Sequence, residues 1–320
     1  MEMLRRMMAS AAMLALLTGA TCAKEITFGS QENENSNVYK GMVAFQEKLN
    51  ELSGGDLTAK LFPSSQLGDF KAMVAMMQAG ELDMATTGYP DMSYVIPELA
   101  LVGAPYVVTD FPALEKIVAG PWGQKMEAKF EEQGVKVIDL WYLGTRQTTA
   151  NKPIESIDDL KGLRMRTPNV PFLIAYAEGV GATPAPVAFA EVYLALQTNQ
   201  VDAQENPLPT IEAMKFYEVQ KAIALTNHFI ASQAIQISLK TWEDLSEQER
   251  GWITEAAKAG GDVTDAANFK AEEDLITKFK DQGLTITEPD LAPFKAAMKG
   301  YYDKLEEQFG KGSIAEVTAE

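Results

Sequence analysis

The chain has 320 residues, of which 28 are Lys or Arg and 45 are Asp or Glu, so its formal net charge is −17. A chain this acidic is not expected to bind nucleic acid or an anionic membrane through its overall field. Its single cysteine and single histidine also leave almost no ligands for a zinc site.

The first 23 residues are typical of a secretory signal peptide. A basic start at Arg5 and Arg6 precedes an apolar run over residues 7–17, and Ala23 is a small residue after which we expect cleavage. The run is shorter than the roughly 20 residues that span a bilayer. The sequence therefore predicts an exported, periplasmic protein that loses Cys22 on processing.

From Lys24 onward, short apolar runs alternate with helical patterns, which predicts βαβ units and a largely parallel sheet. The strands of this half are expected near residues 26–28, 57–61 and 83–87. A helix over residues 42–52 should end at Gly54. A second helix, around residues 73–77, should have Ser64 or Ser65 as its N-cap.

The pattern restarts in the middle of the chain. Strands are expected at residues 135–141, 163–167 and 201–206. A helix should carry Phe189, Val192, Tyr193 and Leu196 on one side, and the chain from Leu245 onward is mostly amphipathic helix. The length suggests two domains, and no long linker separates the halves. The predicted fold is therefore two α/β lobes joined by crossing segments.

Motifs for catalysis are scarce. Any triad would have to use the lone His228, and no serine lies in a G-x-S-x-G turn. The glycines at Gly179 and Gly181 lack the lysine that follows in a phosphate loop. We therefore predict a protein that is not an enzyme, with no catalytic residue, metal or cofactor.

Two arginines lie in the stretch LGTRQTTANKPIESIDDLKGLRMRTPNVP, beside residues that break helices. Side chains alternate along a strand, so Arg164 and Arg166 share one face. Arg166 ends its strand before Pro168, and ligands of open α/β sheets bind at the carboxyl ends of strands. Because a guanidinium matches a carboxylate with two hydrogen bonds, we expect Arg166 to bind one and Arg164 to stay on the surface.

Another interpretation of Arg166 is an ion pair with Asp158 or Asp159. Asn206 also ends a predicted strand, where its amide can both donate and accept hydrogen bonds. The arginine and the amide together predict a site for a small carboxylate.

Three longer motifs, GTRQTTANKPIESIDDLKGLRMRTPN, VAFAEVYLALQTNQVDAQENP and KFYEVQK, resemble the solute-binding proteins of TRAP transporters, the DctP-type family. The likeness extends over nearly the whole chain after residue 23 and is greatest to the sialic-acid-binding branch. It implies a two-lobed periplasmic binding protein, type II-like, with crossing strands and a long connecting helix that close over a ligand. It also implies a monomer that works with the small and large membrane subunits of a permease.

The resemblance also divides the chain. Lobe I is expected to comprise residues 24–143 and 232–271, and lobe II residues 144–231 and 272–320. Four residues match the family's ligand contacts: Arg166 the arginine that grips the carboxylate, Arg146 a second arginine near it, Asn206 an amide on the ligand and Phe189 an aromatic wall. Further pocket residues are expected at Asn169, Gln233 and Gln31, the last where sialic-acid binders carry an asparagine.

Two departures from the sialic-acid binders concern specificity. Those proteins share a glutamate at the position where this chain has Gly88, beside Tyr89. They also share an aspartate at the position where this chain has Phe70. Both losses remove hydrogen-bond acceptors suited to a nine-carbon sugar and predict a less polar far end of the pocket. The sequence therefore favours a hexuronate such as glucuronate or galacturonate.

The alternative ligand is sialic acid, N-acetylneuraminate. A dicarboxylate or keto acid comes third. A secreted enzyme that acts on uronates is less favoured, because it needs a base near neutral pKa and arginine is not an ordinary base. A purely structural exported protein is less favoured still, because it has no use for the paired arginines and the strand-tip amides.

Overall fold

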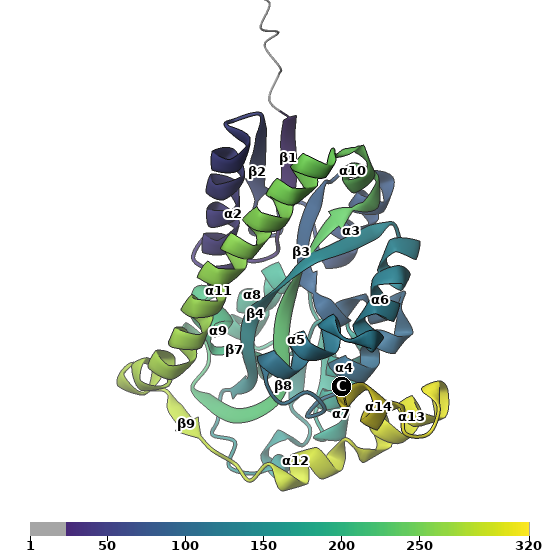
Figure 1. Ribbon diagram of the computed structural model, residues 1–320. Coiled ribbons are helices and arrows are strands. Elements are labelled where there is room, and N and C mark those ends of the chain that lie inside the picture. The colour runs from purple at the N-terminus through teal and green to yellow at the C-terminus, as the bar shows by residue number, and fades with distance from the viewer. Residues whose placement is uncertain (1–23, 320) are drawn as a thin grey trace, which may run out of the picture.

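A single mixed sheet runs through both lobes of this computed structural model, which describes residues 24–319 (Figure 1). The predicted signal peptide, with Cys22 and the cleavage site, lies outside these residues. The strands of the sheet are β1 (Lys24–Gly29), β2 (Leu57–Phe62), β3 (Met84–Gly88), β4 (Val135–Ala150), β5 (Arg164–Thr167), β6 (Thr183–Pro186), β7 (Ala203–Pro207), β8 (Ala222–Ser238) and β9 (Thr285–Thr287). Their order is β2-β1-β3-β8-β4-β7-β5-β6, and β9 pairs with β8.

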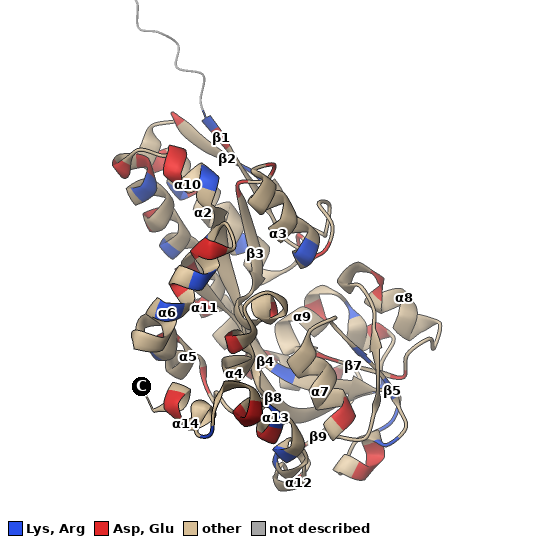
Figure 2. Cartoon of the chain, turned by 90° about the vertical axis from the view of Figure 1, so that its right-hand side faces the viewer, with Lys and Arg blue, Asp and Glu red and all other residues tan. Residues whose placement is uncertain are grey.

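The sheet is parallel at each end and antiparallel in its centre. β1 pairs in parallel with β2 and β3, and β5 pairs in parallel with β6 and β7. β8 is antiparallel to β3 and β4, and β4 is antiparallel to β7. The predicted parallel sheet is correct for the two ends, which lie apart in Figure 2. It is wrong for the centre, because two long strands cross between the lobes in opposite directions.

These two crossing strands are β4 and β8. β4 contains the strand predicted at residues 135–141 and continues through Arg146 to Ala150. Their pairing shifts register at three places, and such irregularities bend and twist a strand pair. Gly144 lies at one of them with φ 127°, a conformation that favours glycine. The strand pair thus forms the predicted crossing segments.

Helices of the first half cover the strands β1 to β3. They are α2 (Asn37–Ser53), α3 (Phe70–Ala79), α4 (Ala100–Gly103), α5 (Phe111–Ala119) and α6 (Pro121–Glu132), with 3₁₀ turns η1 (Tyr89–Tyr94) and η2 (Pro97–Leu99). The predicted helical period is confirmed in α2, where Met42, Phe45 and Leu49 are buried and Gly54 follows with φ 64°.

The predicted N-cap of α3 is wrong. Asp69 caps this helix, because its side chain accepts a hydrogen bond from the Ala72 amide at 2.9 Å. Ser64 and Ser65 instead lie in the preceding turn, with φ values of 59° and 56°. Serine and aspartate are both good caps, so the sequence pattern alone did not decide between them.

Apart from the long helix α11 (Glu247–Asp281), the helices of the second half are short. They are η3 (Ile157–Leu160), α7 (Pro171–Gly179), η4 (Phe189–Glu191), α8 (Val192–Gln197), α9 (Leu208–Ala213), η5 (Phe216–Glu218), α10 (Leu239–Asp244), α12 (Ala292–Ala297), α13 (Lys299–Phe309) and α14 (Ser313–Thr318). The helix predicted from Phe189 onward begins as a 3₁₀ turn and becomes α-helical at Val192.

One helix, α11 (Glu247–Asp281), passes from one lobe to the other (Figure 1). Its first half packs Ile253 into the core beneath β1 and α2, and its last turns pack Phe279 into a core of the second lobe. Near the middle, a Cβ on Gly260 would lie 2.6 Å from the Trp141 ring and 2.7 Å from the Gly41 carbonyl oxygen. Glycine therefore lets α11 lie close to α2 and β4. This is the expected long connecting helix.

The C-terminal helices contact both lobes. Phe294 and Met298 pack into a core with β5 and α7, whereas Leu305 and Val317 belong to the core of α3 to α6. We therefore propose the predicted lobe boundaries with one change, in which α13 and α14 join the first lobe. Within residues 24–319, no helix combines the length and apolar character that crossing a membrane requires.

Candidate functional site

A cavity of about 290 Å³ is lined by segments of both lobes. Ligand cavities are commonly of this size or larger. Nine of the ten residues that the sequence assigns to the ligand line it: Gln31, Phe70, Gly88, Arg146, Arg166, Asn169, Phe189, Asn206 and Gln233. They come from the ends of β1, β3, β5 and β7, from β4 and β8, and from the starts of α3 and η4.

Tyr89 is the tenth residue, and it does not line the cavity. Its side chain is 2% exposed and packs against Phe130, with 5.5 Å between the ring centroids. The chain turns into η1 directly after β3, and this turn directs Tyr89 into the core of the first lobe.

Arg166 lies at the end of β5, as the strand pattern predicts. It is 2% exposed, its Nε donates to the Val187 carbonyl oxygen at 2.9 Å, and its guanidinium lies 5.9 Å from the centre of the Phe189 ring. Nη1 makes no hydrogen bond with any residue of the described chain. Burial lowers the pKa of Arg166 to about 9, so the group is a cation at neutral pH. The cavity therefore contains a buried positive charge with an unused donor.

The alternative partners of Arg166 are engaged elsewhere. Asp158 pairs with Lys161 at 2.7 Å, and the Asp159 side chain accepts from the Ser156 amide in a capping box. Arg164, on the same face of β5, is exposed and forms two hydrogen bonds with Asp202, at 2.6 and 2.9 Å. The structure thus leaves Arg166 free and pairs Arg164 at the surface.

Arg146 also lines the cavity, but its charge already has a partner. Its Nε donates to Glu205 Oε2, and its Nη2 donates to Glu205 Oε1 at 2.8 Å and to the Glu205 carbonyl oxygen at 2.7 Å. Burial alone would raise the pKa of Glu205, but Arg146 and a hydrogen bond from His228 outweigh it and lower that pKa to about 2. Sequence reasoning missed Glu205, because nothing in the pattern joins residues 59 positions apart.

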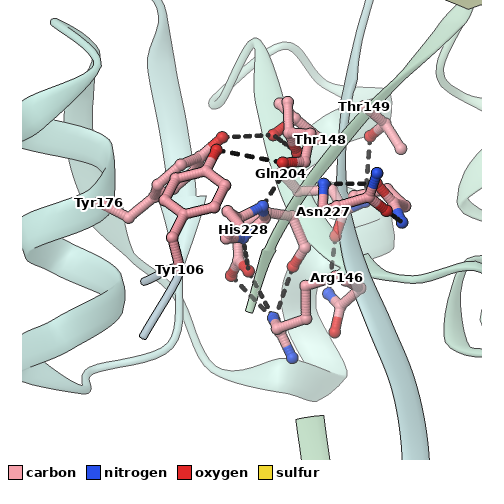
Figure 3. Close-up of polar contacts among 12 residues, drawn as sticks. Tyr106, Arg146, Thr148, Thr149, Tyr176, Gln204, Asn227 and His228 are labelled. Atoms are coloured by element: carbon pink, nitrogen blue, oxygen red, sulfur yellow. Dashed lines mark hydrogen bonds and ion pairs between the residues drawn. The ribbon is translucent and has the colours of Figure 1, made fainter. Parts of the chain in front are cut away.

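His228 completes this network (Figure 3). Its Nε2 lies 3.1 Å from Glu205 Oε2 and its Nδ1 lies 2.9 Å from Thr226 Oγ1. The Tyr176 ring stacks on the imidazole at 3.9 Å between centroids. Burial lowers the pKa of His228, so we take the ring as neutral, with Nε2–H donating to the carboxylate. The histidine therefore positions Glu205 behind the cavity wall.

Asn206 and Gln233 supply amides to the cavity. Asn206 is 3% exposed and its Nδ2 donates to Gln204 Oε1 at 2.7 Å. Gln233 Oε1 is buried and accepts no hydrogen bond from the described residues. The hydroxyl oxygens of Thr87 and Ser232 are also buried and have no hydrogen-bond partner among these residues. These atoms give the wall a set of unused hydrogen-bonding groups, which a polar ligand can engage.

Three carboxylates also line the cavity, beside Phe70 and Gly88. They are those of Glu32, Asp69 and Asp91. Burial raises the pKa of Glu32 to about 7 and that of Asp91 to about 6. The cavity therefore has acceptors that the sequence analysis did not name, while a far end less polar than that of sialic-acid binders stays a prediction. Asp91 follows the tip of β3, and the strand-tip argument used for Arg166 would have found it.

No group of three or more His, Cys, Asp or Glu side chains within residues 24–319 is placed to hold a metal ion. The chemistry of the cavity thus comes from one free guanidinium, several amides and hydroxyls, and carboxylates with raised pKa values. This combination suits a ligand with one carboxylate and several hydroxyl groups.

A family model agrees with this chemistry. The model of the bacterial extracellular solute-binding proteins, family 7 (DctP), matches residues 28–308. The sialic acid-binding periplasmic protein SiaP of Vibrio cholerae is 38% identical over 307 residues, which are 96% of each chain. The 2,3-diketo-L-gulonate-binding periplasmic protein YiaO of Escherichia coli is 31% identical over 90% of this chain and 88% of its own.

Solved structures show the same fold. Two TRAP periplasmic solute-binding proteins of Roseobacter denitrificans are similar to this chain. The one with bound L-galactonate has a TM-score of 0.86 and 29% identity, and covers 92% of this chain and 98% of its own. The one with bound β-D-glucuronate has a TM-score of 0.87 and 26% identity, and covers 92% of this chain and 99% of its own.

Proposed function

The chain belongs to family 7 of the bacterial extracellular solute-binding proteins, the binding components of TRAP transporters, and on this premise we propose that its ligand is a hexuronate such as glucuronate or galacturonate. In this proposal the protein captures the sugar acid between its lobes in the periplasm. It then delivers the ligand to the small and large membrane subunits of a TRAP permease.

The free Nη1 of Arg166 is the observation that carries the proposal. A buried guanidinium without a counter-ion is costly, and a ligand carboxylate offsets that cost with charge-assisted hydrogen bonds. Phe189 lies under the guanidinium, so a sugar ring held at Arg166 can lie against its face. Asn206 and Gln31 line the same cavity and can bind hydroxyl groups.

The comparisons support a six-carbon sugar acid. YiaO is named for 2,3-diketo-L-gulonate, and the two Roseobacter proteins hold L-galactonate and β-D-glucuronate. A cavity of about 290 Å³ is at the small end of the range for ligand sites, roughly 300–1,000 Å³. The second candidate is N-acetylneuraminate, which the 38% identity to SiaP favours.

A thermal-shift panel tests the proposal. A ligand that binds only the folded state stabilises it, by about 2.7 kcal/mol at a hundredfold excess over Kd. We expect D-glucuronate or D-galacturonate to raise the melting temperature more than N-acetylneuraminate at equal concentration. D-glucose is the matched control, because it has the ring without the carboxylate and should give no shift. A larger shift with N-acetylneuraminate would make sialic acid the ligand.

A secreted uronate-active enzyme is distinguished by turnover. Family membership favours binding and transport over catalysis. His228 is fully buried between Thr226, Glu205 and the Tyr176 ring, where it is not available as a base for a ligand in the cavity. We expect the proton NMR spectrum of D-glucuronate to be unchanged after prolonged incubation with the protein.

A further inference from the structure

Asp91 occupies the space that a side chain at position 88 would fill. β3 ends at Gly88, and η1 returns the Asp91 carboxylate over it. A Cβ built on Gly88 would lie 2.4 Å from Asp91 Oδ2 and 2.7 Å from Oδ1. Gly88 has φ −58°, which any residue can adopt, so its backbone does not require glycine. Glycine is needed here to make room for the carboxylate.

The Asp91 carboxylate has no hydrogen-bond donor among the described residues, although it lines the cavity. Charged groups act on it from four other elements: Arg146 on β4, Glu205 on β7, Lys71 on α3 and Arg166 on β5. The Arg146 charge is already offset by Glu205. The cavity therefore has an unpaired cation on the second lobe, Arg166, and an unpaired acceptor group on the first.

Glu32 adds a second acceptor on the first lobe. It is 5% exposed, lines the same cavity, and its Oε2 has no hydrogen-bond partner among the described residues. A buried carboxylate oxygen without a donor destabilises the protein unless a ligand or a proton supplies one. The two acids thus require hydrogen-bond donors on the ligand, whereas Arg166 requires an acceptor.

We infer that Asp91 determines specificity by accepting hydrogen bonds from two neighbouring hydroxyl groups of the ligand, a role the residue at position 88 cannot take. This inference rests on the proposed function and deepens it. Two adjacent hydroxyls present two donors, which match the two carboxylate oxygens of Asp91. A dicarboxylate would instead place its second negative charge beside Asp91 and Glu32. The ligand is therefore a polyhydroxylated monocarboxylate.

Calorimetry with Asp91→Asn tests the inference. The amide has the same shape but only one acceptor and no charge. We expect D-glucuronate to bind this variant about tenfold or more weakly, because hydrogen bonds to charged groups are the stronger ones. Succinate should bind the wild-type protein far more weakly than D-glucuronate, and Asp91→Asn should not weaken it further.

Asp110→Asn is the matched control. Asp110 caps α5, where asparagine can replace it, and it is not among the residues that line the cavity. This variant should bind D-glucuronate as the wild type does. Gly88→Ala is a second variant, which keeps the carboxylate and displaces it, so it should also weaken D-glucuronate. A melting curve of each variant without ligand confirms that it is folded.

The outcomes separate this inference from the hexuronate proposal. If only N-acetylneuraminate binds, the hexuronate proposal fails, and Asp91→Asn must then weaken N-acetylneuraminate, whose glycerol chain carries adjacent hydroxyls. Equal losses in Asp91→Asn and Asp110→Asn would overturn the inference. So would binding of succinate in preference to every polyhydroxylated acid, or no binding of any such acid.

Discussion

Arg146 and Arg166 are two buried arginines of one cavity, and the protein holds them in opposite ways. They are 6% and 2% exposed. Arg146 meets the Glu205 carboxylate and carbonyl oxygen, behind which His228 is fixed. Arg166 meets a backbone carbonyl oxygen and an aromatic face, and one of its terminal nitrogens has no partner in the described chain. The two arginines are therefore similarly buried, but within the described chain only Arg146 is paired with a carboxylate.

This difference suits Arg146 to a structural role and Arg166 to binding a ligand. A buried ion pair with its hydrogen bonds complete fixes the positions of its members, and removing one partner strands the other charge. A buried cation without a counter-ion is instead ready for an anionic ligand. We therefore propose that Arg146 belongs to the framework that joins β4, β7 and β8, and that Arg166 binds the ligand carboxylate. The resemblance had placed both arginines at that carboxylate.

The largest effect is expected from Glu205→Gln. This change leaves Arg146 buried without its counter-charge, so the free energy of unfolding at pH 7 should fall by roughly 3–5 kcal/mol. Urea unfolding measures it. A stability loss no greater than that of an exposed pair would show that Arg146 is not held by Glu205.

The pH dependence of that difference sharpens the test. The pKa of Glu205 is lowered in the folded state, to about 2 from its ordinary value of 4.5. A lowered carboxyl pKa contributes stability that is complete above about pH 4.5 and is lost as the pH falls toward 2. The wild type and Glu205→Gln should therefore converge in stability as the pH is lowered through this window.

Arg166→Lys should affect binding and not folding. Lysine keeps the charge but loses the planar two-donor geometry, so affinity for the ligand should fall, by at most the roughly 2–5 kcal/mol that truncating one partner of a desolvated charge pair costs. Calorimetry gives the affinity and urea unfolding the stability. Arg146→Lys is the counterpart and should lose stability. The reverse pattern would exchange the roles of the two arginines.

Glu32→Gln should stabilise the protein in the absence of ligand. Burial raises the pKa of Glu32 from 4.5 to about 7, so the folded state binds the proton more tightly than the unfolded state. The stability from this group is complete below about pH 4.5 and is lost as the pH rises through about 7. At pH 8 the variant should be more stable by up to about 3 kcal/mol, from 1.36 kcal/mol per pKa unit. Near pH 4 the two should be equal.

Local rules predicted Arg166, and the fold determined the rest of the site. A strand ending at a proline is visible in LRMRTP, and the helical period in α2 is equally local. Glu205 and His228 lie 59 and 82 positions from Arg146, and their contact depends on the pairing of β4 with β7 and β8. Asp91 was missed for a different reason. The sequence predicts the loss of one acceptor at position 88, but it does not show that the following turn returns the Asp91 carboxylate to the same space.

Arg164→Lys should have the smallest effect, and it controls for the others. Arg164 lies two residues before Arg166 on the same strand and pairs with Asp202 at the surface, with Nη2 2.6 Å from Oδ1. Exposed ion pairs gain little, because water and salt screen the charges and holding two long side chains costs entropy. Lysine keeps the charge of this pair, but it cannot reproduce all three hydrogen bonds of Arg164, two to Asp202 and one to the Asn199 carbonyl oxygen. Ligand affinity and melting temperature should both stay within error of the wild type. A clear loss of affinity would mean that altering the surface of β5 disturbs Arg166. The reference for the effect of Arg166→Lys would then be Arg164→Lys and not the wild type.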